Sequence, residues 1–127
     1  MKVINDAKNA PKPVGPYSQA AVSGNFVFSA GQIGISPDTG TLVAGGVESE
    51  ARQVLSNLDA VLKAAGSSFE RVLMTTVFLA DIGDGKTVNQ IYGEFINPNA
   101  APARQTVAVK DLPLGARIEI SVVAEIG

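Results

Sequence analysis

The sequence predicts an α+β fold in which one β-sheet carries two helices on one of its faces. Two segments show the helical hydrophobic period of about 3.6 residues, and strand-like segments lie before, between and after them. The length of 127 residues fits one domain, so we expect residues 1–127 to fold as a single domain. Helices separated by strands, after a β-meander at the start, favour packing of both helices on the same face.

Charge and hydropathy indicate whether the domain contacts other subunits or a membrane. Charged residues make up only 17% of the chain, against about 25% in an average globular domain. We interpret this as an indication of contacts between subunits; a compact, stable monomer is the alternative. No apolar run reaches the ~18–20 residues of a membrane span, and the first residues do not resemble a secretory signal. We therefore expect no membrane association and a cytoplasmic location.

The first third of the chain is expected to be irregular and then to form short strands. Three prolines between residues 9 and 19 favour an extended, irregular segment, which Tyr17 would anchor. Residues 25–30 are typical of a strand. Turn-forming residues occupy 36–41, with short strands expected on either side of the turn, at 32–35 and 42–43.

Helical and strand-like segments alternate in the rest of the chain. Residues 48–65 place apolar side chains at the i, i+3, i+4 and i+7 positions of a helix, and Gly66 follows as the expected C-terminal cap. The remaining expected elements are a buried strand at 71–79, a helix at 86–96, and strands at 104–109 and 117–126.

The composition and the glycine motifs exclude several kinds of site. The chain has no cysteine and no histidine, so it has no disulfide, thiolate nucleophile or Ser-His-Asp triad. Its net charge of −2 argues against nucleic acid as a partner. Gly85-Lys86-Thr87 lacks the second glycine of a phosphate-binding loop, and a turn or helix cap is the preferred interpretation of Asp81 and Asp84. We expect no metal and no organic cofactor.

More informative are an arginine and a glutamate in the two terminal strands. Arg104 begins a strand directly after a proline break, so its backbone is rigid. Its planar guanidinium can grip a carboxylate through two parallel hydrogen bonds. Glu119 lies in an otherwise β-branched strand. The residues themselves leave two interpretations open, a shared site for a small carboxylic acid or two exposed surface charges.

Five motifs, in order along nearly the whole chain, resemble those of the Rid (YjgF) family, whose older name is L-PSP endoribonuclease. They are Gly15-Pro16-Tyr17-Ser18-Gln19, Ser29-Ala30-Gly31-Gln32-Ile33, Val88-Asn89-Gln90-Ile91-Tyr92, Pro102-Ala103-Arg104 and Ile118-Glu119-Ile120. The resemblance implies a chorismate-mutase-like α+β fold with a single mixed sheet. It also implies assembly as a homotrimer, with a ligand cleft between neighbouring subunits.

The same resemblance implies a deaminase that needs no cofactor. Such an enzyme hydrolyses 2-imino and enamine acids, among them 2-iminobutanoate and 2-iminopropanoate (2-aminoacrylate), to 2-oxo acids and ammonia. Carried over by position, the catalytic residues would be Arg104, Glu119 and Tyr17. Arg104 would hold the substrate carboxylate, Glu119 would orient or activate water, and Tyr17 would line the cleft. The expected substrate contacts are the backbone N–H of Gly31, and the side chains of Asn89, Ser29 and Thr106.

Two positions depart from the family's pattern. Ala30 stands where many members have serine, and Gln105-Thr106 replaces a small residue followed by cysteine. Either that cysteine is not required as a nucleophile, or this protein lacks the activity. The changes could also alter the preferred size of the substrate. Arg104, with which the family's deaminase activity is associated, is retained.

The spacing of Arg104 and Glu119 bears on how a shared site is built. If the last two strands formed a hairpin turning near Pro113, the two side chains would lie roughly 13 Å apart along the strands. That distance is too long for one small substrate. Either these strands are not hairpin partners or the two residues meet across a subunit boundary, and we expect a cleft between chains.

Three other functions compete with the deaminase. A binding or regulatory module would use the same pocket for a 2-oxo acid or an amino acid without turnover, and the changes at Ala30 and Gln105-Thr106 favour it somewhat. An endoribonuclease is disfavoured by the lack of histidine, a pI near 5.0 and the absence of a basic aromatic groove. A holdase-like chaperone would exploit the apolar composition, but no specific motif supports it.

Overall fold

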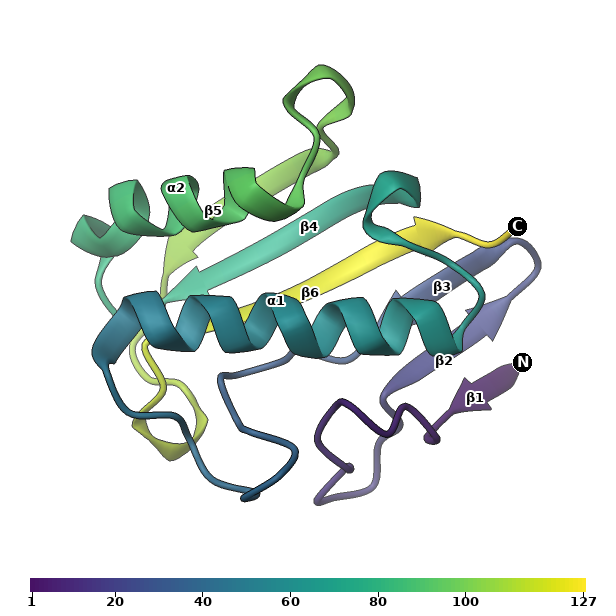
Figure 1. Cartoon of the computed structure of the whole chain (residues 1–127), viewed down its shortest axis with the longest axis horizontal. Helices are drawn as coiled ribbons and strands as arrows, with labels where there is room; N and C mark the ends of the chain where they lie inside the picture. The colour runs from purple at the N-terminus through teal and green to yellow at the C-terminus, as the bar shows by residue number, and fades with distance from the viewer.

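A computed structural model describes residues 1–127, which form a six-stranded sheet with two α-helices on one face (Figure 1). The elements are β1 (Lys2–Ile4), β2 (Ala20–Ser23), β3 (Phe26–Ser29), α1 (Gly46–Ala64), β4 (Val72–Leu79), α2 (Gly85–Phe95), β5 (Ala103–Ala108) and β6 (Ile118–Glu125). A short 3₁₀ turn, Pro113–Gly115, lies between β5 and β6. The α+β fold expected from the sequence is confirmed. Neither helix has the length and apolar character needed to cross a membrane.

The sheet is mixed, with the strand order β1-β2-β3-β6-β4-β5. β4 and β5 run parallel, because α2 provides the crossover between them, and all other neighbours are antiparallel. β4 therefore lies between β5 and β6, and the last two strands do not form a hairpin. Of the two explanations for the spacing of Arg104 and Glu119, the first is confirmed: their strands are not partners.

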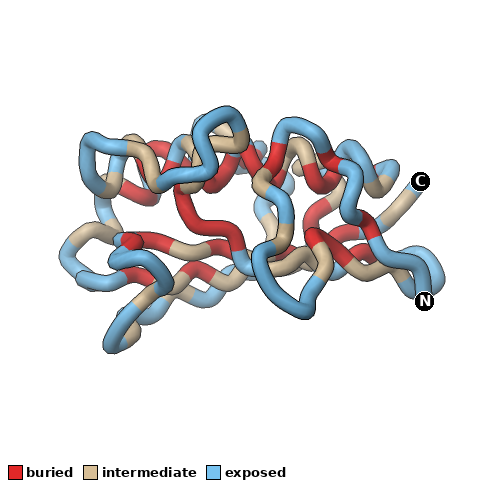
Figure 2. Tube along the Cα trace, turned by 90° about the horizontal axis from the view of Figure 1, so that it is seen from below, coloured by how far each residue is buried: buried red, intermediate tan, exposed pale blue.

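The core lies between the helices and the covered face of the sheet. Leu55, Leu58 and Leu62 of α1 are almost fully buried and belong to one apolar cluster with Val77 and Ile120 of the sheet. The edge-on view in Figure 2 shows a helical layer and a strand layer, with buried segments in both.

The opposite face of the sheet has no helix over it. Val27 is completely buried in the core, so its neighbours Phe26 and Phe28 point to the other side, where they are 42% and 48% exposed. Val107 of β5 pairs with Phe78 of β4 on this same face and is 47% exposed. We call this the open face of the sheet; it is an apolar surface uncovered within one chain.

The predictions fail mainly in the first third of the chain. Residues 32–35 and 42–43 form no strands and make only isolated bridges. The short strands β1 and β2 were not predicted, although β2 and β3 form a tight hairpin around Gly24, whose φ of +57° favours glycine. β1 and β2 are too short to show an alternating pattern, whereas the equally short β3 was predicted at 25–30 from its phenylalanines. By contrast, Gly66 follows α1 in the left-handed conformation expected of a helix cap, with a φ of +81°.

Candidate active site

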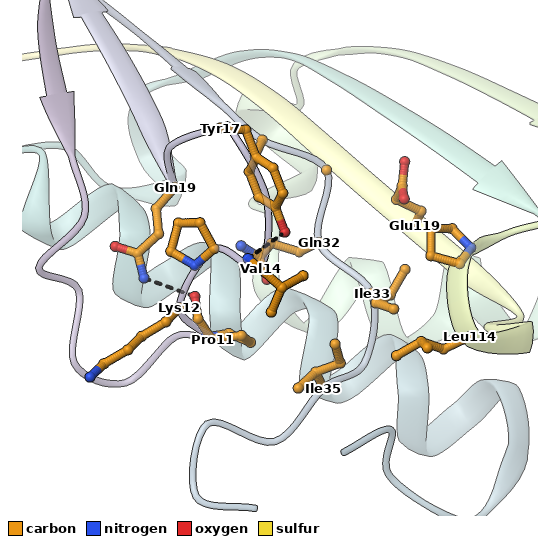
Figure 3. A pocket seen from close by; sticks show the side chains of 14 residues that line it. Pro11, Lys12, Val14, Tyr17, Gln19, Gln32, Ile33, Ile35, Leu114 and Glu119 are labelled. Carbon is orange, nitrogen blue, oxygen red and sulfur yellow. Dashed lines mark hydrogen bonds between the residues drawn. The ribbon is translucent and has the colours of Figure 1, made fainter. Parts of the chain in front are cut away.

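A cavity of about 470 Å³ opens between the N-terminal loop, the segment after β3 and the loop before β6 (Figure 3). Three of the predicted site residues, Tyr17, Gly31 and Glu119, line it, and we call them the cavity group. The other lining residues come from the same segments: Pro11, Lys12, Pro13, Val14, Gln19, Ala30, Gln32, Ile33, Ile35, Pro113 and Leu114.

Gln19 fixes the proline-rich loop that forms one wall of the cavity. Its side chain is only 1% exposed. The Nε2 group donates to the carbonyls of Ala7 at 3.2 Å and Pro11 at 3.0 Å, and Oε1 accepts from the Ala7 N–H at 3.0 Å. The Tyr17 hydroxyl accepts from the Val14 N–H at 3.4 Å, as the dashed line in Figure 3 shows. These bonds order a loop that has no regular secondary structure.

Gly31 and Glu119 lie in direct contact. A Cβ atom on Gly31 would lie 2.7 Å from Oε2 of Glu119, so glycine alone leaves room for the carboxyl group. Backbone hydrogen bonds in both directions between Gln32 and Ile120, at 2.9 and 3.1 Å, hold the two segments together. Burial raises the pKa of Glu119 above its ordinary value. A carboxyl group with a raised pKa on a cavity wall is suited to exchange protons with a ligand or water.

Two buried polar side chains of α1 fix the remaining walls. Asn57, fully buried, donates to the carbonyls of Ile33 at 3.3 Å and Ile35 at 2.9 Å. Glu50, 4% exposed, accepts from the backbone N–H of Arg117 at 2.8 Å, next to the start of β6. The two side chains are two helical turns apart on one side of α1, so a single rigid element positions both the segment after β3 and the start of β6.

Arg104 lies outside this cavity. It sits on β5 directly opposite Thr75 of β4, and its guanidinium carbon lies 4.8 Å from the centre of the Tyr92 ring on α2. Arg52 and Arg117 each bind a carboxylate at 2.8 Å, whereas Arg104 forms no ion pair within the chain. Its hydrogen-bonding edge is therefore free to bind an acid.

Two other predicted residues belong with Arg104, and we call the three the arginine group. Asn89 is exposed on α2, three residues before Tyr92 and so on the same side of the helix. Thr106 lies two residues after Arg104 on the same face of β5, and its buried Oγ1 atom has no hydrogen-bond partner. Ser29 belongs to neither group, because its hydroxyl accepts from the Val122 N–H at 2.9 Å and continues the pairing of β3 with β6.

The register of the sheet separates the two groups within one chain. Arg104 pairs with Thr75, which faces the helices, whereas Glu119 pairs with Phe78, which lies on the open face. The positions of Arg104 and Glu119 are three residues apart along β4 and two strands apart across the sheet. Their Cα atoms therefore lie about 14 Å apart. One chain therefore carries two incomplete parts of the predicted site, on opposite faces of its sheet.

Several contributing residues were missed by the sequence reasoning. Tyr92 and Gln19 lie inside two of the motifs that resemble the family, so the sequence marked their positions but indicated no role for them. Asn57 was detectable only as a polar residue within the apolar stripe of a helix. Leu114, at the cavity wall with an unusual φ of 58°, left no signal in the sequence.

Comparison with known proteins places the chain in a family. The sequence profile described as Endoribonuclease L-PSP matches residues 7–126. The chain belongs to this family, the Rid family. The resemblance drawn from the five motifs is thereby confirmed. Human 2-iminobutanoate/2-iminopropanoate deaminase is 50% identical over 123 residues, which cover 97% of this chain and 88% of the human protein.

Solved structures of Rid family relatives share the fold closely. A putative endoribonuclease of Thermotoga maritima superposes with a TM-score of 0.95 and 42% identity, covering 100% of this chain and 99% of the other. TdcF of E. coli, solved with bound serine, gives a TM-score of 0.91 and 36% identity and covers 100% of both chains. The chorismate-mutase-like α+β architecture expected from the resemblance is confirmed.

Proposed function

We propose that this protein is an imine deaminase that hydrolyses 2-iminobutanoate, 2-iminopropanoate and their enamine forms to 2-oxo acids and ammonia. The observation that carries the proposal is the 50% identity, over nearly the whole chain, with the human protein of that name. The geometry supports it, because the chain offers an unpaired arginine for a carboxylate and a half-buried carboxyl group on a cavity wall.

The reaction needs only the residues of the two groups. Arg104 binds the substrate carboxylate through its guanidinium edge, and the Gly31 N–H contributes a further hydrogen bond to the substrate. Glu119 accepts a proton from a water molecule as the oxygen bonds to the carbon of the protonated C=N group, giving a neutral carbinolamine. Glu119 then returns the proton to nitrogen. The C–N bond breaks and ammonia leaves, while the hydroxyl proton passes to Glu119 as the C=O bond of the 2-oxo acid forms. A positioned base of this kind contributes about 10²- to 10⁴-fold.

We further propose that the active site forms between chains of a homotrimer. Within one chain the two groups are about 14 Å apart and on opposite faces of the sheet, which is too far for one small substrate. The open face exposes Phe26, Phe28 and Val107, the kind of surface that another subunit covers. In this arrangement the arginine group of one subunit faces the cavity group of its neighbour. The cytoplasmic location expected from the sequence stays a prediction, which cell fractionation would check.

A coupled assay tests the deaminase activity. A threonine or serine dehydratase generates the imine in place, and release of 2-oxo acid is followed with and without the protein. We expect wild type to accelerate release and Arg104→Ala to abolish the acceleration. Equal release with and without wild-type protein would refute the proposed activity.

Subunit mixing tests the location of the site. Arg104→Ala and Glu119→Gln chains are each expected to be inactive alone. When equal amounts are refolded together, about one quarter of the interfaces combine an intact arginine group with an intact cavity group, so about a quarter of the activity should return. No recovery in verified mixed trimers would place the whole site within one chain.

A non-catalytic carboxylate-binding module is the second candidate. TdcF, a relative of the same fold, was solved with serine bound, and the Ala30 and Gln105-Thr106 positions depart from the pattern of many members. Calorimetric binding of 2-oxobutanoate to a protein that shows no turnover would favour this candidate. An endoribonuclease activity, which the family's older name describes, has no histidine to perform acid–base cleavage here; an RNA degradation assay serves as the control.

A further inference from the structure

Three side chains from three elements meet on the covered side of the sheet near its β5 edge. Thr75 and Arg104 are direct partners in the parallel ladder between β4 and β5, so their side chains leave the same face. α2 packs over this position and places the Tyr92 ring against both. The Tyr92 hydroxyl and Thr75 Oγ1 are 2.9 Å apart, and the two residues are 8% and 1% exposed.

Stacking on a ring leaves an arginine free to bind a ligand. The guanidinium carbon of Arg104 lies 4.8 Å from the Tyr92 centroid, within the range of a cation–π contact. Such a contact pairs no N–H donor with an acceptor atom, and no ion pair of the chain includes Arg104. An ion pair within the chain would instead occupy those donors. Tyr92 can therefore hold Arg104 in place without competing with a carboxylate.

The Tyr92 hydroxyl has a role that simple core packing does not require. A phenylalanine would fill nearly the same volume without bringing a polar group into the core, and a buried hydroxyl is tolerated only when it is hydrogen-bonded. Thr75 supplies that bond at 2.9 Å from a residue that is itself fixed in a central strand. The bond restrains the ring on which Arg104 rests.

We propose that Tyr92, held by Thr75, is the positioning residue that presents the edge of the Arg104 guanidinium to the substrate carboxylate. The proposal rests on the proposed function, in which Arg104 binds that carboxylate. It assigns neither Tyr92 nor Thr75 any contact with the reacting C=N bond. Their effect is therefore on substrate binding, and Glu119 performs its proton transfers independently of them.

Kinetics of four variants test this assignment. Tyr92→Leu removes the platform and is expected to raise KM about 3- to 10-fold while kcat changes less than about 2-fold. Thr75→Val keeps the shape but removes the hydrogen bond, and we expect a KM increase of about 2- to 3-fold. Tyr92→Phe should lie between wild type and Tyr92→Leu, because it restores the ring. Ser56→Ala is the control, since it removes a hydroxyl from an exposed position of α1 away from the sheet, and it should leave KM unchanged.

A double-mutant cycle separates positioning from a general effect on the fold. In an Arg104→Ala background, Tyr92→Leu should no longer weaken binding of 2-oxobutanoate, because the group it positions is gone. A purely structural role would lower the melting temperature and the active fraction alike in both backgrounds, without a specific change in KM. Equal weakening of 2-oxobutanoate binding in both backgrounds would overturn the proposal.

The outcomes distinguish this inference from the proposed function. If Arg104→Ala does not weaken binding of 2-oxobutanoate, the carboxylate role of Arg104 fails and the proposed function fails with it. If Arg104→Ala weakens binding but Tyr92→Leu and Thr75→Val do not, only the positioning role is refuted. Should Tyr92→Leu fail to fold, Thr75→Val decides: an increased KM at unchanged kcat supports the proposal, and an unchanged KM refutes it.

Discussion

At the scale of single residues, the contact between Gly31 and Glu119 determines where the carboxyl group can lie. Because a Cβ at position 31 would approach Oε2 to 2.7 Å, Gly31→Ala must displace the carboxyl group from the cavity wall. We expect kcat in the coupled assay to fall between about 10- and 100-fold, because misplacing a reacting group by about 1 Å can cost as much as about 10²-fold. Gly93→Ala is the control, since a Cβ there meets nothing within 4 Å. Equal activity of the two variants would contradict this geometry.

The ionisation of Glu119 links activity and stability to pH. Burial raises the pKa of Glu119, so wild-type activity should fall as the pH drops through that raised value, when the base becomes protonated. Glu119→Gln should lose about 10²- to 10⁴-fold in kcat at neutral pH.

Stability should change in the opposite direction. Above the raised pKa the folded protein holds a partly desolvated anion, which Glu119→Gln removes, so the variant should melt at a higher temperature than wild type at neutral pH. As the pH falls through the raised pKa towards the ordinary glutamate value of about 4.3, this difference should vanish, because Glu119 is then protonated in both states. Thermal melts from pH 3 to 8 measure it, with the exposed Glu125→Gln as the control. A gap between the melting temperatures that persists at low pH would exclude ionisation as its cause.

At the scale of elements, α1 does more than close the core. Asn57 donates to the carbonyls of Ile33 and Ile35. The Ile33 carbonyl also accepts from the Ile35 N–H at 2.8 Å, whereas the Ile35 carbonyl loses its hydrogen bond when the amide is removed. Asn57→Leu should therefore lower the free energy of unfolding by about 1–3 kcal/mol, the cost of one unpaired buried acceptor. It should also reduce turnover, because the cavity wall after β3 loses its support.

Urea denaturation measures this effect. Ser56→Ala, at the exposed neighbouring position, is the control, and its free energy of unfolding should stay within about 0.5 kcal/mol of wild type. A loss for Asn57→Leu no greater than that of the control would show that the two hydrogen bonds do not hold the segment. A normal KM and kcat in a destabilised Asn57→Leu protein would show that the segment keeps its place without them.

The elements also show what sequence patterns can and cannot determine. The helices and β4, β5 and β6 were predicted to within about two residues, because each is long enough to display its hydrophobic period. β1 and β2 were missed because they are too short to show a hydrophobic period and lack the phenylalanines that indicated β3. Arg104 and Glu119 were singled out as candidates, but the placement of their strands on either side of β4 was not predicted. Strand order is set by packing over the whole sheet and leaves no local signal.

At the scale of the whole molecule, the trimer that we propose would cover the open face and complete the active site in one event. The helices bury one face of the sheet, and the other keeps its phenylalanines half-exposed. Within one chain the arginine group and the cavity group lie on opposite faces of the sheet, so the site that we propose needs two chains. An assembly that buries the open face would therefore stabilise the fold and create the site at once.

A charge on the open face should prevent assembly without preventing the folding of the single chain. Phe28→Asp places an anion where a neighbouring subunit would pack, and an unpaired buried charge is strongly unfavourable. We expect a folded monomer by sedimentation velocity, with a helical circular dichroism spectrum and less than about 1% of wild-type deaminase activity. Ser56→Glu, on the exposed side of α1 away from the sheet, should stay assembled and active. A monomeric Phe28→Asp protein with full activity would mean that one chain is sufficient, and that Arg104 and Glu119 do not act on the same substrate.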